Sequence, residues 1–301
     1  MDLMLNKDQV AVQEAIEAIA SDFSSSPTDF HGFALVSPEL ESILVDNGFF
    51  EILAIPELGP VSAAVTVERL ARLPYTVETA LSMMLSHVLG DVERPIALVD
   101  GLRPGRFVRQ ANTVVVVDDD RIGLCHPDPS EVVDRPDALY AYPMANLVSL
   151  DGVQWFSDAE AERVKTWLRI ALANEMAGLL QGAIDATVAH LSVRKQFGRP
   201  LGSFQALRHR LAECTVLSEG VRWLAVKAAW SGDAGDAALA AYHAQDAATR
   251  VIYDVHQMSG AMGMTLEMDL HLWTYRMKAL LSELGGRGGQ AKAVGQHVFG
   301  V

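Results

Sequence analysis

One stretch of the sequence combines the residue types that suit anion binding. Residues 194–212 read RKQFGRPLGSFQALRHRLA and contain Arg194, the aromatic Phe197 and Gln205. The turn at 197–200 interrupts a helical pattern, because Gly198 is flexible and Pro200 lacks an N–H and restricts the residue before it. Helix starts with nearby arginines are ready sites for phosphate. The stretch therefore predicts either a basic turn between two helices or an anion site where the second helix begins.

The same stretch resembles the flavin-binding signature of the acyl-CoA dehydrogenase family. The shared pattern is Arg-x-Gln-Phe-Gly-x-Pro-Leu-x-x-Phe-Gln, with Leu-Ala soon after it. Such a long, ungapped pattern is more specific than a short glycine motif. The resemblance implies a mainly α fold, with an N-terminal helical domain, a small β domain and a C-terminal four-helix bundle. It also implies FAD as the cofactor, bound in part by Arg194, Phe197 and Gln205.

A second segment, HQMSGAMGMTLE at 256–267, resembles the family's Gln-x-x-Gly-Gly-x-Gly turn. Gln257, Gly260 and Gly263 match that turn, and Ala261 replaces its middle glycine. In the family this segment crosses a subunit interface to the pyrophosphate and adenine half of the neighbour's FAD. Without the resemblance, the same residues predict a helix C-terminus with glycine caps.

The chemistry implied by the resemblance is α,β-dehydrogenation of an acyl-CoA thioester. A carboxylate removes the α-proton while the β-hydride passes to the flavin, so the base must be held dry with a raised pKa. Counting from Gln257 and Gly260 places the family's usual base position on Leu284, one residue after Glu283. Glu283 is therefore either the catalytic base or a solvated or capping acid. Arg169 matches an arginine that the family keeps near substrate, and Leu168 occupies the position where some members place the base.

The hydrophobic pattern divides the chain into three expected domains: residues 1–92 helical, 93–152 a reduced and mostly antiparallel β unit, and 153–301 a helical bundle. Helices are expected near 6–23, 38–48, 61–72, 75–89, 157–193, 203–230, 237–258 and 269–284, and strands near 95–100, 112–118, 122–125, 131–133 and 147–150. Ser157 and Glu160 have the spacing of a capping box. The β unit lacks the Thr-Glu-Pro and Trp-Ile-Thr-like elements that contact the flavin ring in the family, which argues against a self-sufficient flavin site.

Composition narrows the class of protein. The 301 residues are 50% hydrophobic and carry a net charge of -14, which argues against nucleic-acid binding. Cys125 and Cys214 have neither metal-ligand nor disulfide spacing, so we expect a reducing cytoplasm and no metal site. No charge-free apolar run of about 18 residues predicts a membrane span. The first residues do not have the pattern of a signal peptide.

Three functions remain open. The first is a subunit of a heterotetrameric acyl-CoA dehydrogenase, paired with a longer subunit of the same family. It resembles the shortened actinobacterial subunits that oxidise bulky CoA thioesters, such as those of steroid catabolism, and relatives pass electrons to an electron-transferring flavoprotein. The second is a self-contained homo-oligomeric dehydrogenase with Glu283 as base. The third is a non-catalytic assembly or regulatory protein of this fold.

Overall fold

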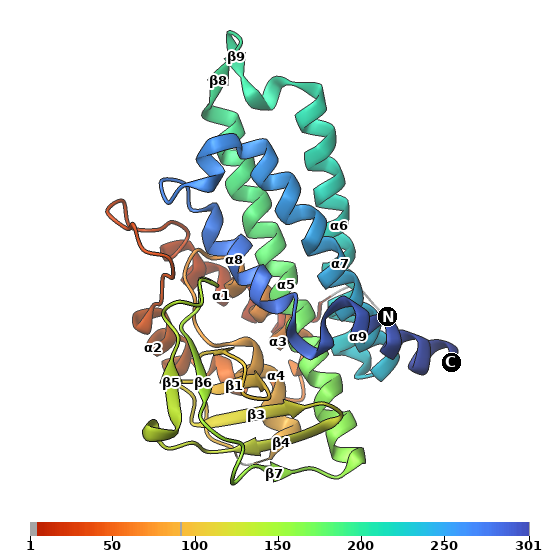
Figure 1. The fold of residues 1–301 in the computed structure, drawn as a ribbon. Coiled ribbons are helices and arrows are strands. Elements are labelled where there is room, and N and C mark those ends of the chain that lie inside the picture. The colour runs from red at the N-terminus through yellow and green to blue at the C-terminus, as the bar shows by residue number, and fades with distance from the viewer. Residues whose placement is uncertain (1–4, 91, 301) are drawn as a thin grey trace.

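A long helix, α5 (Asp158–Val193), runs through the centre of the molecule (Figure 1). The computed structural model describes residues 5–90 and 92–300. Helix α5 begins where the sequence predicts, because the Ser157 N–H donates to Glu160 Oε2 at 3.0 Å in the capping box. Most of its side chains between 164 and 184 are buried, because other elements pack around it.

Three further helices pack with α5 into the predicted four-helix bundle: α6 (Gln205–Ser231), α7 (Ala234–Ser259) and α8 (Leu270–Leu280). The expected last helix over 269–284 is wrong at its end, since α8 stops at Leu280. A separate helix, α9 (Gly286–Val294), follows after a tight turn and packs against α7.

Within residues 5–90, the N-terminal part contains the four α-helices that the sequence predicts: α1 (Lys7–Asp22), α2 (Pro38–Asp46), α3 (Gly59–Ala71) and α4 (Ala80–Leu89). A short 3₁₀ helix, Phe49–Ala54, joins α2 to the segment before α3. Side-chain caps mark the starts of α1 and α2. Asn6 accepts a hydrogen bond from the Gln9 N–H, and Ser37 accepts one from the Leu40 N–H. Helix α3 crosses α5 so closely that the backbones nearly touch at Gly178.

The β unit contains two small sheets. The larger has the order β1 (Ile96–Asp100), β3 (Thr113–Asp118), β4 (Arg121–Cys125) and β7 (Gln154–Trp155). The smaller has the order β2 (Gly105–Arg106), β6 (Met144–Leu147) and β5 (Val132–Asp134). All pairings except the parallel β1–β3 pair are antiparallel, in agreement with the expected unit. Strand β7 lies beyond the expected boundary at 152 and pairs with β4.

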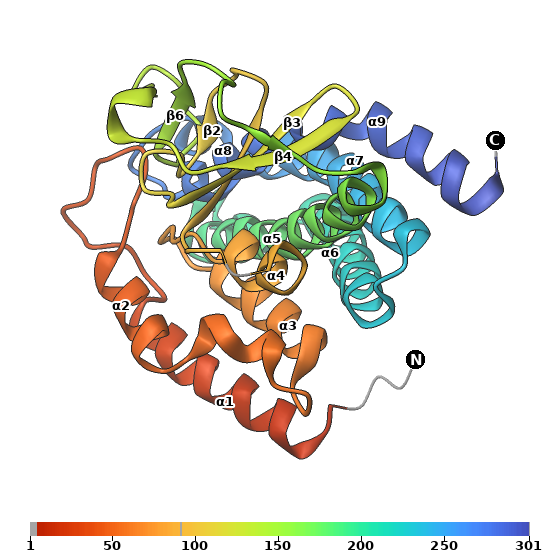
Figure 2. The same ribbon diagram turned by 90° about the horizontal axis from the view of Figure 1, so that it is seen from below.

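The larger sheet is buried on both faces. Val115 and Val117 on β3 belong to the main core with the helices, whereas Val114 and Val116 join a second core with the smaller sheet. This alternation follows from the period of two along a strand. Figure 2 shows the strands on one side of α5 and helices α1 to α3 on another. A site between the sheets and the bundle is therefore formed by segments far apart in the sequence.

Candidate functional site

The predicted anion-binding stretch forms a hairpin at one end of the bundle (Figure 1). Its strands, β8 (Lys195–Gln196) and β9 (Arg199–Pro200), join the end of α5 to a 3₁₀ turn (Leu201–Ser203) before α6. Phe197 and Gly198 at the tip have φ of 54° and 77°. A left-handed conformation is strained for an aromatic residue and is more common at functional sites.

The hairpin exposes cations next to aromatic rings. Phe197 is 87% exposed, and its ring meets that of Phe204 edge to face at 6.0 Å. The Arg199 guanidinium lies 4.0 Å from the centre of the Phe204 ring. Arg194 and Gln205 are exposed at the end of α5 and the start of α6. These groups can contact a phosphate and a flat ring without any rearrangement of the core.

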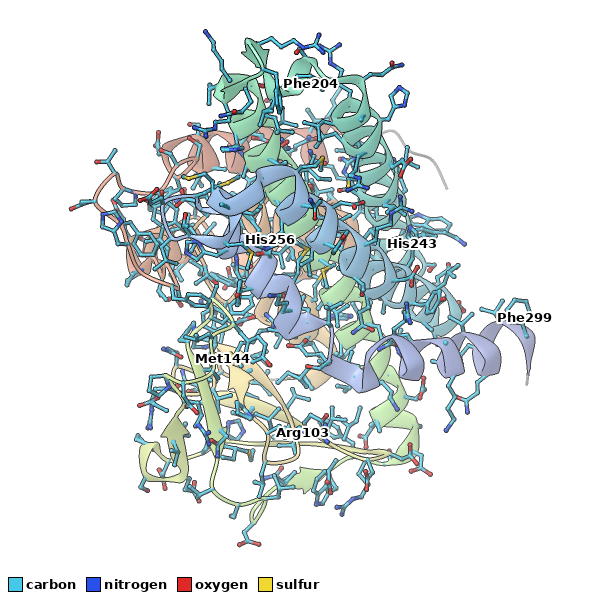
Figure 3. The ribbon with its side chains drawn as sticks, turned by 45° about the horizontal axis from the view of Figure 1, so that its top comes forward. Arg103, Met144, Phe204, His243, His256 and Phe299 are labelled. Carbon is cyan, nitrogen blue, oxygen red and sulfur yellow. The ribbon has the colours of Figure 1, made fainter. Side chains whose placement is uncertain are left out.

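The second motif lies at the same end of the bundle, where α7 ends (Figure 1). Gln257 and Gly260 line an open hollow of about 540 Å³, together with Tyr253 and His256. Gly260 has φ 61° and ψ -146°, a conformation almost restricted to glycine. In Figure 3, His256 lies below Phe204, which is at the tip of the bundle. The structure thus brings both predicted cofactor motifs to one end of the molecule.

Close packing requires a glycine at position 263, whereas Gly260 lies at an open surface. It is buried in the 3₁₀ helix Gly260–Met264, and a Cβ on it would approach Ser259 Cβ to 2.8 Å. Beside it, His256 Nε2 lies 3.0 Å from Thr274 Oγ1, while His256 Nδ1 has no hydrogen-bond partner within the described residues. Burial, with Lys278 nearby, lowers the pKa of His256, so the neutral ring is favoured.

Glu283 lies elsewhere, in the turn between α8 and α9, and its carboxylate is engaged. Glu283 Oε1 accepts from Arg106 Nε at 2.8 Å. Arg106 is 1% exposed, and its Nη1 donates to Glu175 Oε1 at 3.0 Å. The Tyr142 hydroxyl donates to the same Glu175 oxygen at 2.7 Å. We call these four residues the Arg106 cluster; they come from β2, the segment before β6, α5 and the α8–α9 turn.

The Arg106 cluster holds its charges in a dry place. Burial raises the pKa of Glu283, and Arg106 opposes part of that rise. Burial also works against the charge on Arg106, but Glu175 and Glu283 outweigh it and raise the pKa of Arg106 well above its usual value. Arg106 therefore remains a cation, and Glu283 is its ion-pair partner.

A cavity of about 530 Å³ opens beside this cluster, between the strands and α8. Its lining includes Leu98, Arg106, Tyr275, Glu283 and Leu284. Glu283 therefore faces a space where a ligand could lie, as a base must, but one of its oxygens is bonded to Arg106. The buried Leu284, at the family's usual base position, carries no proton acceptor.

Arg169 supports the turn beside Glu283 through Gln290. Its Nε donates to Gln290 Oε1 at 2.9 Å, and Gln290 Nε2 donates to the Leu284 carbonyl at 3.0 Å. That carbonyl belongs to a turn in which Leu284 has φ 55° and Gly285 has φ 81°. Arg169 and Glu283 thus belong to one neighbourhood, with Arg169 supporting the turn.

Three members of the Arg106 cluster, Arg106, Tyr142 and Glu175, are not predicted from the sequence. Glu175 carries a signal, since it is an acid within a nearly continuous apolar segment of α5. Arg106 lies in a two-residue strand with no periodic pattern, so nothing local distinguishes it from the exposed Arg103.

Known proteins agree with this architecture. Residues 161–297 match the family model for the acyl-CoA dehydrogenase C-terminal domain. Acyl-CoA dehydrogenase FadE34 of Mycobacterium tuberculosis is 34% identical over 156 residues, which is 50% of this chain and 22% of that protein. The chain spans less than half the length of the first curated relatives that it matches.

Solved structures match the fold along the whole chain. One is described as a Tcur3481-Tcur3483 steroid ACAD variant, with a TM-score of 0.79, 20% identity and 99% of both chains covered. Another is the ChsE4-ChsE5 complex from Mycobacterium tuberculosis, with a TM-score of 0.74, 18% identity and 100% of both chains covered. Residues 161–297 are therefore an acyl-CoA dehydrogenase C-terminal domain, within a chain that has the acyl-CoA dehydrogenase fold. The family resemblance predicted from the stretch 194–212 is confirmed over residues 161–297.

Proposed function

We propose that this chain is a subunit of an FAD-dependent acyl-CoA dehydrogenase and that a longer subunit of the same family supplies the catalytic base. The chain contributes Arg194, Phe197, Gln205 and Gln257 to FAD bound at the subunit interface, with Gly260 at the surface there and the buried Gly263 supporting the turn. The observation that carries this proposal is the separation of two regions. Most residues of the cofactor motifs lie exposed at one end of the bundle, whereas Glu283 is paired with Arg106 beside the cavity between the strands and α8.

The exposed end suits the diphosphate and adenine part of FAD. It offers the Arg194 cation, the exposed Phe197 ring and the side-chain amide of Gln257. Gly260 presents no Cβ to hinder close approach of a ligand. When bound, FAD accepts the hydride of the dehydrogenation. The residues of this chain would hold and orient its distant half, and Arg169 would support the Leu284 turn.

A heterotetramer is the proposed assembly, since the two solved relatives are described by pairs of proteins. One of them is described as a steroid ACAD, which supports a bulky, steroid-derived acyl-CoA as the substrate class. A structure described as an electron transferring flavoprotein also shares the fold. We propose such a flavoprotein as the electron acceptor, in the cytoplasm. Within residues 5–90 and 92–300, no helix is long and apolar enough to cross a membrane.

Two alternatives lead to different outcomes. In a self-contained homo-oligomer, Glu283 would have to leave Arg106 and act as the base, which its position beside the cavity permits. A non-catalytic assembly or regulatory protein would keep the fold and bind no flavin.

Co-expression with longer acyl-CoA dehydrogenase subunits separates the three. The chain is purified alone and with each partner, and the visible flavin absorbance and the oxidation of acyl-CoA are measured. We expect a colourless chain alone and a yellow, active complex. A yellow and active chain alone would favour the homo-oligomer, whereas no flavin in any preparation would favour the non-catalytic protein.

Variants of the exposed end test its part in cofactor binding. In the complex, Arg194→Gln and Phe197→Ala should each weaken FAD retention by about tenfold, because each removes one contact. Arg135→Gln is the matched control, since Arg135 is an exposed arginine that pairs with Asp137 in the β unit. Equal flavin retention in all three variants would show that the exposed end does not bind FAD.

A further inference from the structure

A polar pocket lies where the N-terminal helices meet the bundle. It holds about 280 Å³ and is lined by residues of α1, α3, α5 and α6. Figure 2 shows α3 between α1 and α5. Gly178 allows α3 to lie close to α5 here, since a Cβ on it would lie 2.1 Å from the Glu68 carbonyl oxygen. The lining residues differ from those of the cavity beside Arg106 and of the hollow at the end of α7.

Two opposite charges face each other in this pocket without touching. The Glu68 side chain is 12% exposed, and its Oε2 lies 3.9 Å from Arg222 Nε, which is too far for a hydrogen bond. Arg222 Nη1 is also 3.9 Å from the nearest oxygen of Glu219. Within residues 5–90 and 92–300, neither the Glu68 carboxylate nor the Arg222 guanidinium has a hydrogen-bond partner. A group placed between them that donates to Glu68 and accepts from Arg222 would satisfy both charges.

Other polar groups around the pocket are already held in place. Arg69 Nε donates to Glu17 Oε2 at 2.7 Å. Arg72 Nε donates to Asp185 Oδ2 at 2.7 Å, and Gln181 Nε2 donates to the other oxygen of Asp185 at 2.9 Å. The terminal N–H groups of both arginines make no hydrogen bond to the described part of the chain. These side chains can therefore contact a ligand without losing the partners that orient them.

The charge balance of the lining decides which kind of ligand fits. Three arginines and three glutamates line the pocket, so its formal charge is zero: Arg69, Arg72, Arg222, Glu17, Glu68 and Glu219. The whole chain carries a net charge of -14, which repels free anions. An anion alone would leave Glu68 without a partner, and a cation alone would leave Arg222 without one. A small molecule that carries both signs matches the pocket.

We propose that this pocket binds a small polar α-amino acid as a zwitterion. Its ammonium group donates to Glu68, its carboxylate accepts from Arg222, and its side chain lies towards the amide of Gln181. Burial raises the pKa of Glu68, and the arginines, Arg222 first, oppose part of that rise. An ammonium group beside Glu68 favours the carboxylate further. The ligand ties the N-terminal helices to the bundle, and the inference does not depend on the proposed function.

A panel of small ligands tests the assignment on the wild-type chain, or on its complex if the chain is obtained only with a partner. Isothermal titration is carried out with L-glutamine, L-serine, succinate and putrescine. We expect the amino acids to bind once per chain and at least about tenfold more tightly than succinate or putrescine, which satisfy one sign of charge each. Succinate binding as tightly as the amino acids would identify an anion site and overturn the proposal. Absence of saturable binding for both amino acids would overturn it as well.

Variants locate the bound amino acid. Glu68→Gln and Arg222→Gln should each weaken amino-acid binding by roughly tenfold or more, because each removes one charge-assisted contact. Glu39→Gln and Arg103→Gln are the matched controls, since both residues are exposed and lie outside the pocket. Thermal unfolding without ligand establishes that each variant is folded, and the ligand should raise the midpoint of wild type and controls only. Binding unchanged in both pocket variants would show that the amino acid lies elsewhere.

Discussion

At the scale of single residues, Arg106 decides how Glu283 can be used. A general base must present a free lone pair to the proton that it removes. Burial raises the pKa of Glu283, as a base requires, but one of its oxygens is bonded to the buried Arg106 guanidinium, which opposes part of that rise. A desolvated acid is therefore not enough to identify a base, and its ion-pair partner must be considered with it.

Under the proposed function, Glu283→Gln should leave acyl-CoA oxidation by the active complex within about twofold of wild type, because the longer subunit supplies the base and Glu283 stays paired with Arg106. The substitution keeps the acceptor oxygen for Arg106 Nε. Steady-state rates at saturating acyl-CoA measure the effect. A fall of about a hundredfold or more in kcat, with an unchanged thermal midpoint, would instead identify Glu283 as the base.

Glu78 gives a pH dependence of stability. It is 3% exposed at the start of α4, where it accepts from the Leu81 N–H at 2.9 Å and interacts with Ser82. Burial raises its pKa from 4.5 to about 7, although the Ser82 bond opposes this. The folded chain therefore keeps a proton that the unfolded chain loses. Its contribution to stability is fully present below pH 4.5 and is lost as the pH rises towards 7.

Glu78→Gln removes this loss and retains an acceptor oxygen. Relative to wild type, we expect the variant to gain on the order of 3 kcal/mol of unfolding free energy between about pH 4.5 and 7. Urea unfolding at several pH values measures the difference. The same change at Glu39, an exposed acid in the first turn of α2, is the control. Parallel pH curves for wild type and Glu78→Gln would contradict the prediction.

At the scale of elements, glycines in α5 set the distance between the N-terminal helices and the bundle. A Cβ on Gly178 would lie 2.1 Å from the Glu68 carbonyl oxygen in α3. A Cβ on Gly182 would lie 2.2 Å from Trp273 Nε1 in α8. Two neighbouring elements thus approach α5 more closely than any larger residue would permit.

Gly178→Ala should therefore destabilise the chain by about 1–3 kcal/mol through overpacking, despite the higher helix propensity of alanine. Gly288→Ala in α9 is the matched control, because nothing lies within 4 Å of its Cβ position. There the same change should stabilise by about 0.5–1 kcal/mol. Thermal unfolding of both variants measures these changes in stability. Equal effects of the same sign would show that the close approach of α3 at Gly178 does not affect stability.

The sequence predicts those elements that have local signals. The capping box at Ser157 gives the start of α5, and the Phe-Gly-Arg-Pro turn gives its end. Helix α9 was missed, since its first turn contains Gly286, Gly288 and Gly289, which disfavour a helix in isolation. It is stabilised by contact with α7 and by the buried Gln290, which are tertiary effects.

The candidate site was predictable to the extent that it follows a contiguous motif. Arg194, Phe197 and Gln205 stand in one ungapped stretch, and the structure keeps them at one end of the bundle. The Arg106 cluster joins positions 106, 142, 175 and 283, so only the folded chain brings them together. Charge pairing over such separations has no periodicity in the sequence.

At the scale of the whole molecule, the proposed cofactor-binding end is separate from the cavity beside the ion-paired Glu283. If the longer subunit provides the complete flavin-ring site, each pair of chains forms a single working interface. We expect the purified complex to contain about one FAD for each pair of chains, as measured by flavin absorbance against total protein. A content of about one FAD for every chain would mean that this chain also completes a flavin site.

The Arg106 cluster also bears on how such a division of labour can evolve. A buried arginine with two carboxylate partners is costly to lose, because its removal would leave Glu175 and Glu283 without a counter-charge in the interior. A full rearrangement of this cluster involves a strand, a helix and a turn. If the proposed division of labour holds, the energetics of the core would help to keep this chain dependent on the base of its partner subunit, even without selection for the partnership itself.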